Sequence, residues 1–201
     1  MIDRRTVLAG AAALALPFTR TAKAEAPADW PARLVQAAEA QIGVTVTYDP
    51  AYVRLDYPGG DVPRDRGVCT DVLVRAYRDA FGIDLQRLVH EDMRANFARY
   101  PKAWGLSRPD RSIDHRRVPN LQTFFRRFGR ELPVGGDATY AEGDLVSQML
   151  PGNLPHILIV TGQAGPSGAP LVVHNIGGGT RREDRLHEFP ITGHYRFAPT
   201  A

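Results

Sequence analysis

The sequence predicts an α+β fold in which N-terminal helices carry the chain's one cysteine and a small antiparallel sheet follows them. Apolar residues recur at helical spacing in several segments before residue 130. After residue 144 the pattern changes to short apolar runs separated by turns rich in glycine and proline. Helices first and strands second are typical of an α+β layout.

The expected helices precede the expected strands along the chain. The helices cover 31–42, 68–81, 85 to about 100, and 121–128, with Asp84 and Asn120 as N-caps of the last two. The strands cover 44–48, 145–149, 156–161, 171–175 and 194–197. The loop 49–66 leads straight into the second helix, and loops of this length without structure of their own are uncommon unless they line a site.

Residues 1–24 have the pattern of a cleavable export signal. Arg4 and Arg5 precede an apolar run over 7–16, and 22–24 form the small-x-small site that a signal peptidase cuts. The apolar run is too short to cross a bilayer, so we expect no integral membrane span. Residues 3–8 also look like a twin-arginine signal, with the Sec route as the alternative. The sequence therefore predicts a periplasmic or otherwise exported protein.

Residues 25–201 are predicted to form a single domain. Four of the 25 basic and one of the 22 acidic residues lie in 1–24, which leaves 21 of each. This balance gives no case for binding nucleic acid or anionic membranes. A sole cysteine in an exported chain cannot form an internal disulfide, so it is either buried or kept as a functional thiol. We expect a monomer.

Cys69 is predicted to lie at or next to the N-terminus of the second helix. Backbone N–H groups and the helix dipole there stabilise a thiolate, so a cysteine in this position can be a nucleophile near neutral pH. Asp71 lies in the same helical turn, where its carboxylate favours the dipole and opposes a thiolate beside it. The alternative is a small buried thiol that packs the first turn.

Two histidines are expected on neighbouring strands. His156 opens one apolar run and His174 closes the next, so a symmetric hairpin would place the two imidazoles opposite each other on one face. A one-residue bulge in the turn would exchange His174 for Asn175. A thiol nucleophile needs a base, and the base needs a group that orients it. Cys69, His156 and His174 can fill these roles in that order.

The arrangement resembles the NlpC/p60 superfamily of papain-like cysteine hydrolases: a cysteine on a helix, then Gly143-Asp144-Leu145-Val146, then 155–160, then a polar residue on the following strand. Segments 67–72, 113–121 and 173–177 look more narrowly like a bacterial family known as domain of unknown function 1287, within that group. The resemblance implies a papain-like fold that cleaves amide bonds of cell-wall peptides, with Cys69 as nucleophile, His156 as base and His174 as orienting residue. It departs from the commoner Asp-Cys-Ser-Gly pattern around the nucleophile.

Other residues are given simpler interpretations. Tyr48, Tyr52 and Tyr57 are candidates to line a substrate groove, and covering a core edge is their alternative role. The segment 114–117 is interpreted as a hydrogen-bonded loop brace, since nothing in the sequence connects it to the cysteine. The segment 181–184 has charges of both signs and is interpreted as solvated surface.

The predicted function is hydrolysis of peptidoglycan stem-peptide amides through a Cys-His-His triad and an acyl-enzyme, with no cofactor and no metal. One alternative is an acyltransferase, or a hydrolase of another amide or ester, with the same triad. Another is a cell-wall-binding module without activity. A zinc site built from Cys69, His156 and His174 ranks last, because the spacings match no zinc signature.

Overall fold

The computed structural model describes residues 26–136 and 138–199. The helices in this part are α1 (Trp30–Glu39), α2 (Cys69–Phe81), α3 (Leu85–Asn96) and α4 (Val118–Phe128), with short 3₁₀ turns η1 (Phe97–Arg99) and η2 (Asp114–Arg116). The strands are β1 (Thr47–Tyr48), β2 (Arg66–Gly67), β3 (Arg130–Glu131), β4 (Leu145–Leu150), β5 (Leu154–Ala164), β6 (Pro170–Asn175), β7 (Thr180–Glu183) and β8 (Ile191–Arg196).

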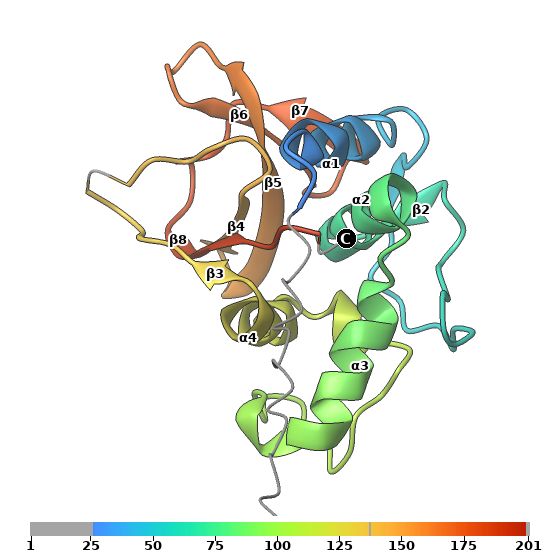
Figure 1. Ribbon diagram of the computed structural model, residues 1–201. Coiled ribbons are helices and arrows are strands. Elements are labelled where there is room, and N and C mark those ends of the chain that lie inside the picture. The colour runs from blue at the N-terminus through green and yellow to red at the C-terminus, as the bar shows by residue number, and fades with distance from the viewer. Residues whose placement is uncertain (1–25, 137, 200–201) are drawn as a thin grey trace, which may run out of the picture.

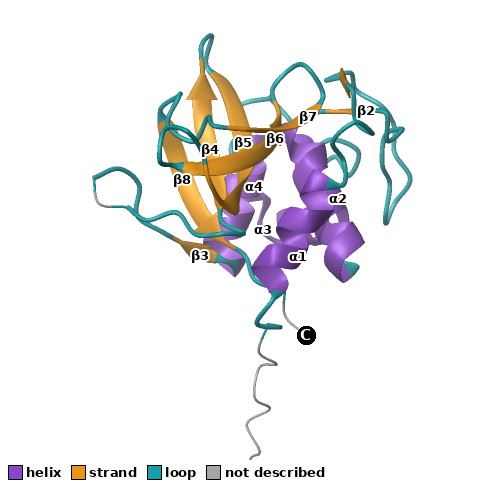
Figure 2. Cartoon of the chain, turned by 90° about the horizontal axis from the view of Figure 1, so that it is seen from above, coloured by secondary structure: helices purple, strands orange, loops and turns teal. Residues whose placement is uncertain are grey.

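A six-stranded antiparallel sheet and the helices packed on it confirm the α+β prediction. The strand order is β3-β8-β4-β5-β6-β7, and β1 and β2 form a separate parallel pair. Helices α1, α2 and α4 lie on one side of this sheet and contact β5, as Figures 1 and 2 show. The helix that carries the cysteine therefore packs directly against the strand that carries His156.

The sheet separates two apolar clusters. Alternate residues of β5 contribute to each: Ile157 and Ile159 pack with the helices, while Leu158 and Val160 pack on the other face. Cys69 belongs to the cluster on the helix side. This division decides which side chains of β5 and β6 can reach the cysteine.

The helix predicted at 121–128 begins earlier than expected, at Val118. Pro119 in the first turn suits a helix start, because its fixed φ and missing N–H cost nothing there. Asn120 is therefore not the N-cap; it lies inside α4 and its side chain donates to the Asp114 carbonyl at 3.0 Å. Asp84 caps α3 as predicted, accepting the Arg87 N–H.

The segment 181–184 has exposed side chains at Arg181 and Arg182, as expected for solvated surface, but it also contributes to a strand that the sequence analysis did not predict. Residues Thr180–Glu183 form β7, an edge strand that pairs with β6. Charged side chains are common on such edge strands because they discourage pairing with other chains. The expected strand 44–48, in contrast, is reduced to the two residues of β1.

The loop 49–66 is held against α2 by Arg75. The Arg75 side chain is fully buried, and its guanidinium donates to the Asp61 carboxylate and to the carbonyls of Val62 and Arg66. A buried guanidinium needs such partners, since leaving it unpaired would cost several kcal/mol. The loop is thereby fixed against the helix whose first residue is Cys69.

No helix within residues 26–136 and 138–199 has both the length and the apolar character needed to cross a membrane. The predicted export signal, residues 1–24, lies outside the described residues.

Candidate active site

Cys69 is the first residue of α2, as the sequence predicts. Val68 precedes it in an extended conformation, and the Val68 N–H donates to Asp71 Oδ2 at 2.7 Å. The Asp71 carboxylate therefore caps the helix start from the third helical position, which is one half of a capping box. This bond fixes the backbone on either side of the cysteine.

Arg116 forms a buried bidentate ion pair with Asp71. Its Nε and Nη2 lie 2.9 Å from Asp71 Oδ1 and Oδ2, and the two side chains are only 2% and 4% exposed. The same guanidinium donates to the carbonyls of Ala51 and Asp49 at 3.1 Å. Arg116 thus ties η2, the loop 49–66 and the cysteine turn together. The sequence interpretation of 114–117 as a brace was correct, but the assumption that nothing connects it to the cysteine was wrong.

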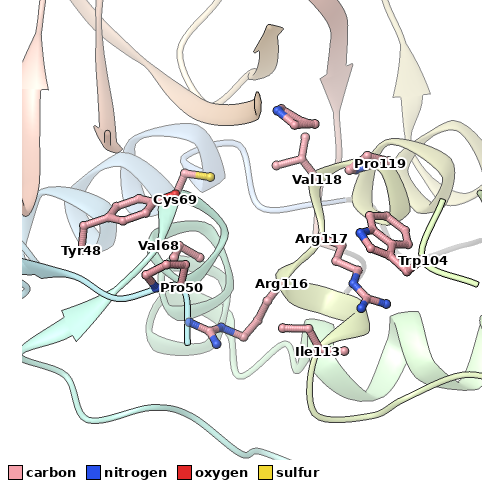
Figure 3. Close-up of a pocket in the computed structure, with 11 residues that line it drawn as sticks. Tyr48, Pro50, Val68, Cys69, Trp104, Ile113, Arg116, Arg117, Val118 and Pro119 are labelled. Atoms are coloured by element: carbon pink, nitrogen blue, oxygen red, sulfur yellow. The ribbon is translucent and has the colours of Figure 1, made fainter. Parts of the chain in front are cut away.

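Cys69 opens onto a pocket of about 200 Å³. In Figure 3, Tyr48 and Cys69 lie on one side of the pocket, and Trp104 and Arg117 lie on the other. Arg116 also lines it. The remaining lining residues are apolar: Pro50, Val68, Ile113, Val118, Pro119 and Pro155.

Of the three tyrosines proposed for substrate binding, the structure places Tyr48 in this pocket. Burial, together with the nearby Cys69 and Asp71, raises the pKa of Tyr48 to about 12, so its hydroxyl stays protonated. Tyr52 is 60% exposed and donates to Asp110, and the ring of Tyr57 packs edge-on against His90. Neither Tyr52 nor Tyr57 lines the pocket that contains Cys69.

The two histidines are hydrogen-bonded to each other, but not in the register expected. His156 Nε2 lies 2.8 Å from His174 Nδ1. Direct opposition would pair Ile159 with Leu171, whereas Ile159 pairs with Val173. The register is shifted by two residues, with an irregularity between Val160 and Ala164. An even shift keeps both imidazoles on one face, so they meet diagonally.

A third residue, Glu183 on β7, extends this pair. Its Oε2 lies 3.0 Å from His174 Nε2. Burial lowers the pKa of both imidazoles, that of His156 to about 3, so both rings are neutral. A neutral His174 that donates to the carboxylate leaves its Nδ1 as an acceptor. His156 must then donate through Nε2, and its Nδ1 keeps a free lone pair, the form that a general base needs.

The structure does not join Cys69 to either histidine by a hydrogen bond among the described residues. Strand alternation directs His156 and His174 to the sheet face opposite the helices, whereas Cys69 packs on the helix face. The sulfur nevertheless lies beside β5, where the backbone N–H of Ile157 faces it and favours its thiolate form. The peptide that carries this N–H also links Ile157 to His156.

The resting thiol is neutral. Burial, and then the charge of Asp71, raise the pKa of Cys69 to about 11, although the backbone N–H groups of Ile157, Thr70 and Cys69 partly counteract this effect. The helix start thus favours a thiolate, as the sequence indicates, but it does not have the largest effect on the pKa of Cys69. Desolvation of the charged sulfur outweighs the helix N-terminus.

Asn175, the alternative to His174, points to the helix face. Its side-chain amide donates to the Gly67 carbonyl at 3.0 Å, two residues before Cys69. That bond connects β6 to the segment that enters α2. His174 is the residue that bonds to His156, and Asn175 is the one that holds the cysteine segment.

Among the described residues, no three His, Cys, Asp or Glu side chains converge in a way that could hold a metal ion. The zinc arrangement considered from the sequence therefore has no support in the geometry.

Fold and pocket define an α+β protein whose one cysteine begins a helix and opens onto a partly cationic pocket. The chain belongs to the family described as "Domain of unknown function (DUF1287)", whose profile matches residues 35–197. It is similar to "Uncharacterized protein YijF" of Escherichia coli (strain K12), with 52% identity over 165 residues that cover 82% of this chain and 80% of that protein. The narrower of the two resemblances seen in the sequence is thereby confirmed.

Sequence reasoning missed Arg116, Arg117, Trp104 and Glu183 as residues of the site. Two of them belong to the segment 114–117, whose unusual density of charge was a signal, but no local pattern shows which residue it pairs with. Arg116 and Asp71 are 45 residues apart in the chain. Glu183 could have been found only by recognising β7 as a strand.

Proposed function

We propose that this protein is an exported cysteine hydrolase of the NlpC/p60 type that cleaves amide bonds in peptidoglycan stem peptides. The observation that carries the proposal is the position of Cys69, at the start of α2 and open to a pocket, next to the strand that carries a His156–His174–Glu183 chain. This is the set of groups that thiol-dependent acyl transfer requires: a nucleophile, a base and groups that orient the base.

In the proposed reaction the Cys69 sulfur attacks the amide carbonyl carbon, and the thiol proton passes to His156 Nδ1. Collapse of the tetrahedral intermediate breaks the C–N bond, the amine leaves with that proton, and a thioester remains. Water then attacks the thioester with His156 again as base, which releases the acid and restores the thiol. The N–H groups of Cys69 and Ile157 are the candidates to stabilise the oxyanion.

Because the resting thiol and imidazole are both neutral, proton transfer accompanies the attack instead of preceding it. His156 Nδ1 must approach the sulfur more closely than it does in the resting site. Catalytic hydrogen bonds are often long in a free enzyme and tighten when substrate binds. The imidazole and the sulfur start on opposite faces of β5, so the strand must rearrange around the 156–157 peptide for the two to meet.

The second candidate is a cell-wall-binding module without catalysis. The observation that favours it is the resting geometry itself, with the imidazoles on the opposite sheet face and the thiol pKa raised. Transfer to another acceptor, or hydrolysis of a different amide or ester, would use the same groups and differs only in substrate.

Digestion of purified peptidoglycan tests the proposal. The mature protein and the Cys69→Ala, His156→Gln and His174→Gln variants are compared, and released fragments are identified by mass. We expect new fragments from the wild type and none from Cys69→Ala or His156→Gln. Absence of fragments from every protein, with Cys69 inert to alkylation at all pH values in the folded state, would favour the binding module.

A further inference from the structure

Two adjacent arginines line the cysteine pocket, and they are neutralised to very different extents. Arg116 is saturated by its bidentate pair with Asp71. Arg117 makes a single 3.4 Å contact, from Nη1 to Asp114 Oδ1, among the described residues, and its side chain is 18% exposed. A contact of this length and geometry is much weaker than a bidentate one.

The acids near Arg117 are themselves engaged by other donors. Asp114 Oδ2 accepts the backbone N–H of Asp110. The Asp110 carboxylate accepts the Ser112 N–H at 2.9 Å and the Tyr52 hydroxyl at 3.1 Å. Burial lowers the pKa of Arg117 despite these two acids, which indicates a guanidinium whose lost hydration is not fully replaced.

Trp104 holds this guanidinium in place without using its hydrogen-bond donors. The Arg117 Cζ lies 4.2 Å from the centre of the Trp104 ring, and Figure 3 shows the two side chains next to each other at the pocket wall. Stacking of this kind orients the planar fork and leaves its in-plane N–H groups free. A carboxylate matches that fork with two parallel hydrogen bonds.

The rest of the described pocket lining carries no carboxylate. Its net charge comes from Arg117, since Asp71 neutralises Arg116. A partly desolvated cation among apolar walls favours an anionic group on a small apolar ligand, because the anion replaces the hydration that the guanidinium has lost.

We propose that Arg117 and Trp104 form a subsite that binds a carboxylate of the substrate, close to the amide that Cys69 attacks. This inference rests on the proposed function and makes its substrate class specific: peptides that carry a free carboxylate on a residue next to the cleaved bond. The Arg117 guanidinium binds the carboxylate through two N–H groups, and the pocket walls bind the aliphatic part.

Binding is measured without catalysis, on the folded Cys69→Ser protein. N-acetyl-D-alanine is titrated against N-acetyl-D-alaninamide, and the indole N–H of Trp104 is followed by NMR. We expect the acid to shift this signal saturably and to bind about tenfold or more tightly than the amide. Arg117→Gln should abolish the preference, Arg117→Lys should keep part of it, and Arg99→Gln, an exposed arginine outside the pocket, should keep all of it.

Equal binding of acid and amide, no saturable binding of either, or a preference that survives Arg117→Gln in a folded variant would each overturn the inference. Failure of the proposed hydrolase function would give a different combination of results from failure of the subsite. Arg117-dependent binding of the acid, without any Cys69-dependent release of wall fragments, would keep the subsite and reject the hydrolase. Cys69-dependent cleavage that is equally fast on substrates with amidated carboxylates would keep the hydrolase and reject the subsite.

Discussion

The Arg116 guanidinium and the Asp71 carboxylate form a buried, bidentate ion pair directly beneath the first turn of the cysteine helix. The pair connects η2 and the loop 49–66 to the backbone that presents Cys69. The segments that it joins all contribute residues to the pocket lining.

Removing one member of this pair should be strongly destabilising. Arg116→Leu leaves Asp71 charged, buried and unpaired, and we expect a loss of about 3–5 kcal/mol in the free energy of unfolding, measured by urea denaturation. Arg64→Leu, which breaks an exposed pair with Asp79, is the matched control and should cost about 1 kcal/mol or less. The double variant Asp71→Leu/Arg116→Leu should be more stable than Arg116→Leu. If Arg116→Leu costs no more than Arg64→Leu, the buried Asp71–Arg116 pair does not stabilise the fold more than an exposed ion pair does.

Glu183 is predicted to be a positioning residue that sets the tautomer of His156 through His174. In Glu183→Leu, His174 loses the carboxylate that accepts the hydrogen bond from its Nε2. We expect activity on the wall substrate to fall about tenfold or more, as when a triad loses its orienting acid. Glu183→Gln, which retains an acceptor oxygen, should recover part of the activity.

Imidazole ¹⁵N NMR separates this role from a merely structural one. Wild-type His156 should carry its proton on Nε2, and Glu183→Leu should lose that single tautomer, while the exposed Glu188→Leu should retain it. A His156 protonated on Nδ1 in the wild type would contradict the assignment.

Alkylation of Cys69 should report a neutral resting thiol. Because burial and Asp71 raise the thiol pKa to about 11, the rate with iodoacetamide should be low at pH 5–7 and should still be rising with pH above 9. A small free thiol in the same assay is the control. A rate that is already on a plateau below pH 7 would instead indicate a thiolate–imidazolium pair, and the neutral mechanism would have to be abandoned.

His115 should contribute to acid unfolding. Burial, and then the charge of Arg116, lower its folded pKa to about 3, below the unfolded value near 6.5. Between these values the unfolded state binds more protons, so stability rises with pH across this window and is lost as pH falls.

Replacing His115 with a side chain that does not titrate tests this predicted direction of the pH dependence. In His115→Gln the slope of unfolding free energy against pH, between pH 4 and 6, should fall by about 1.4 kcal/mol per pH unit. The matched control is His187→Gln, because that imidazole is exposed. A slope in His115→Gln equal to that of the wild type would show that His115 is not buried as a neutral ring.

The sequence alone was sufficient for the elements whose signals are local. Helical spacing predicted α2 with Cys69 at or next to its start, and Asp84 was identified as the cap of α3. Short apolar runs bounded by turn residues predicted β4 and β6 to within a residue. Each of these features depends on residues that are close in the sequence, which is the range over which periodicity and capping act.

Tertiary structure alone decided the site. The pairing of Arg116 with Asp71, and of Glu183 with His174, depends on how distant segments pack, and no periodicity encodes it. The β5–β6 register was decided by the turn irregularity, which moved the histidines from direct to diagonal contact. The pKa of Cys69 follows the same logic: the helix start is a local feature and favours a thiolate, but burial under the sheet is a property of the whole fold, and its desolvation cost is the larger effect.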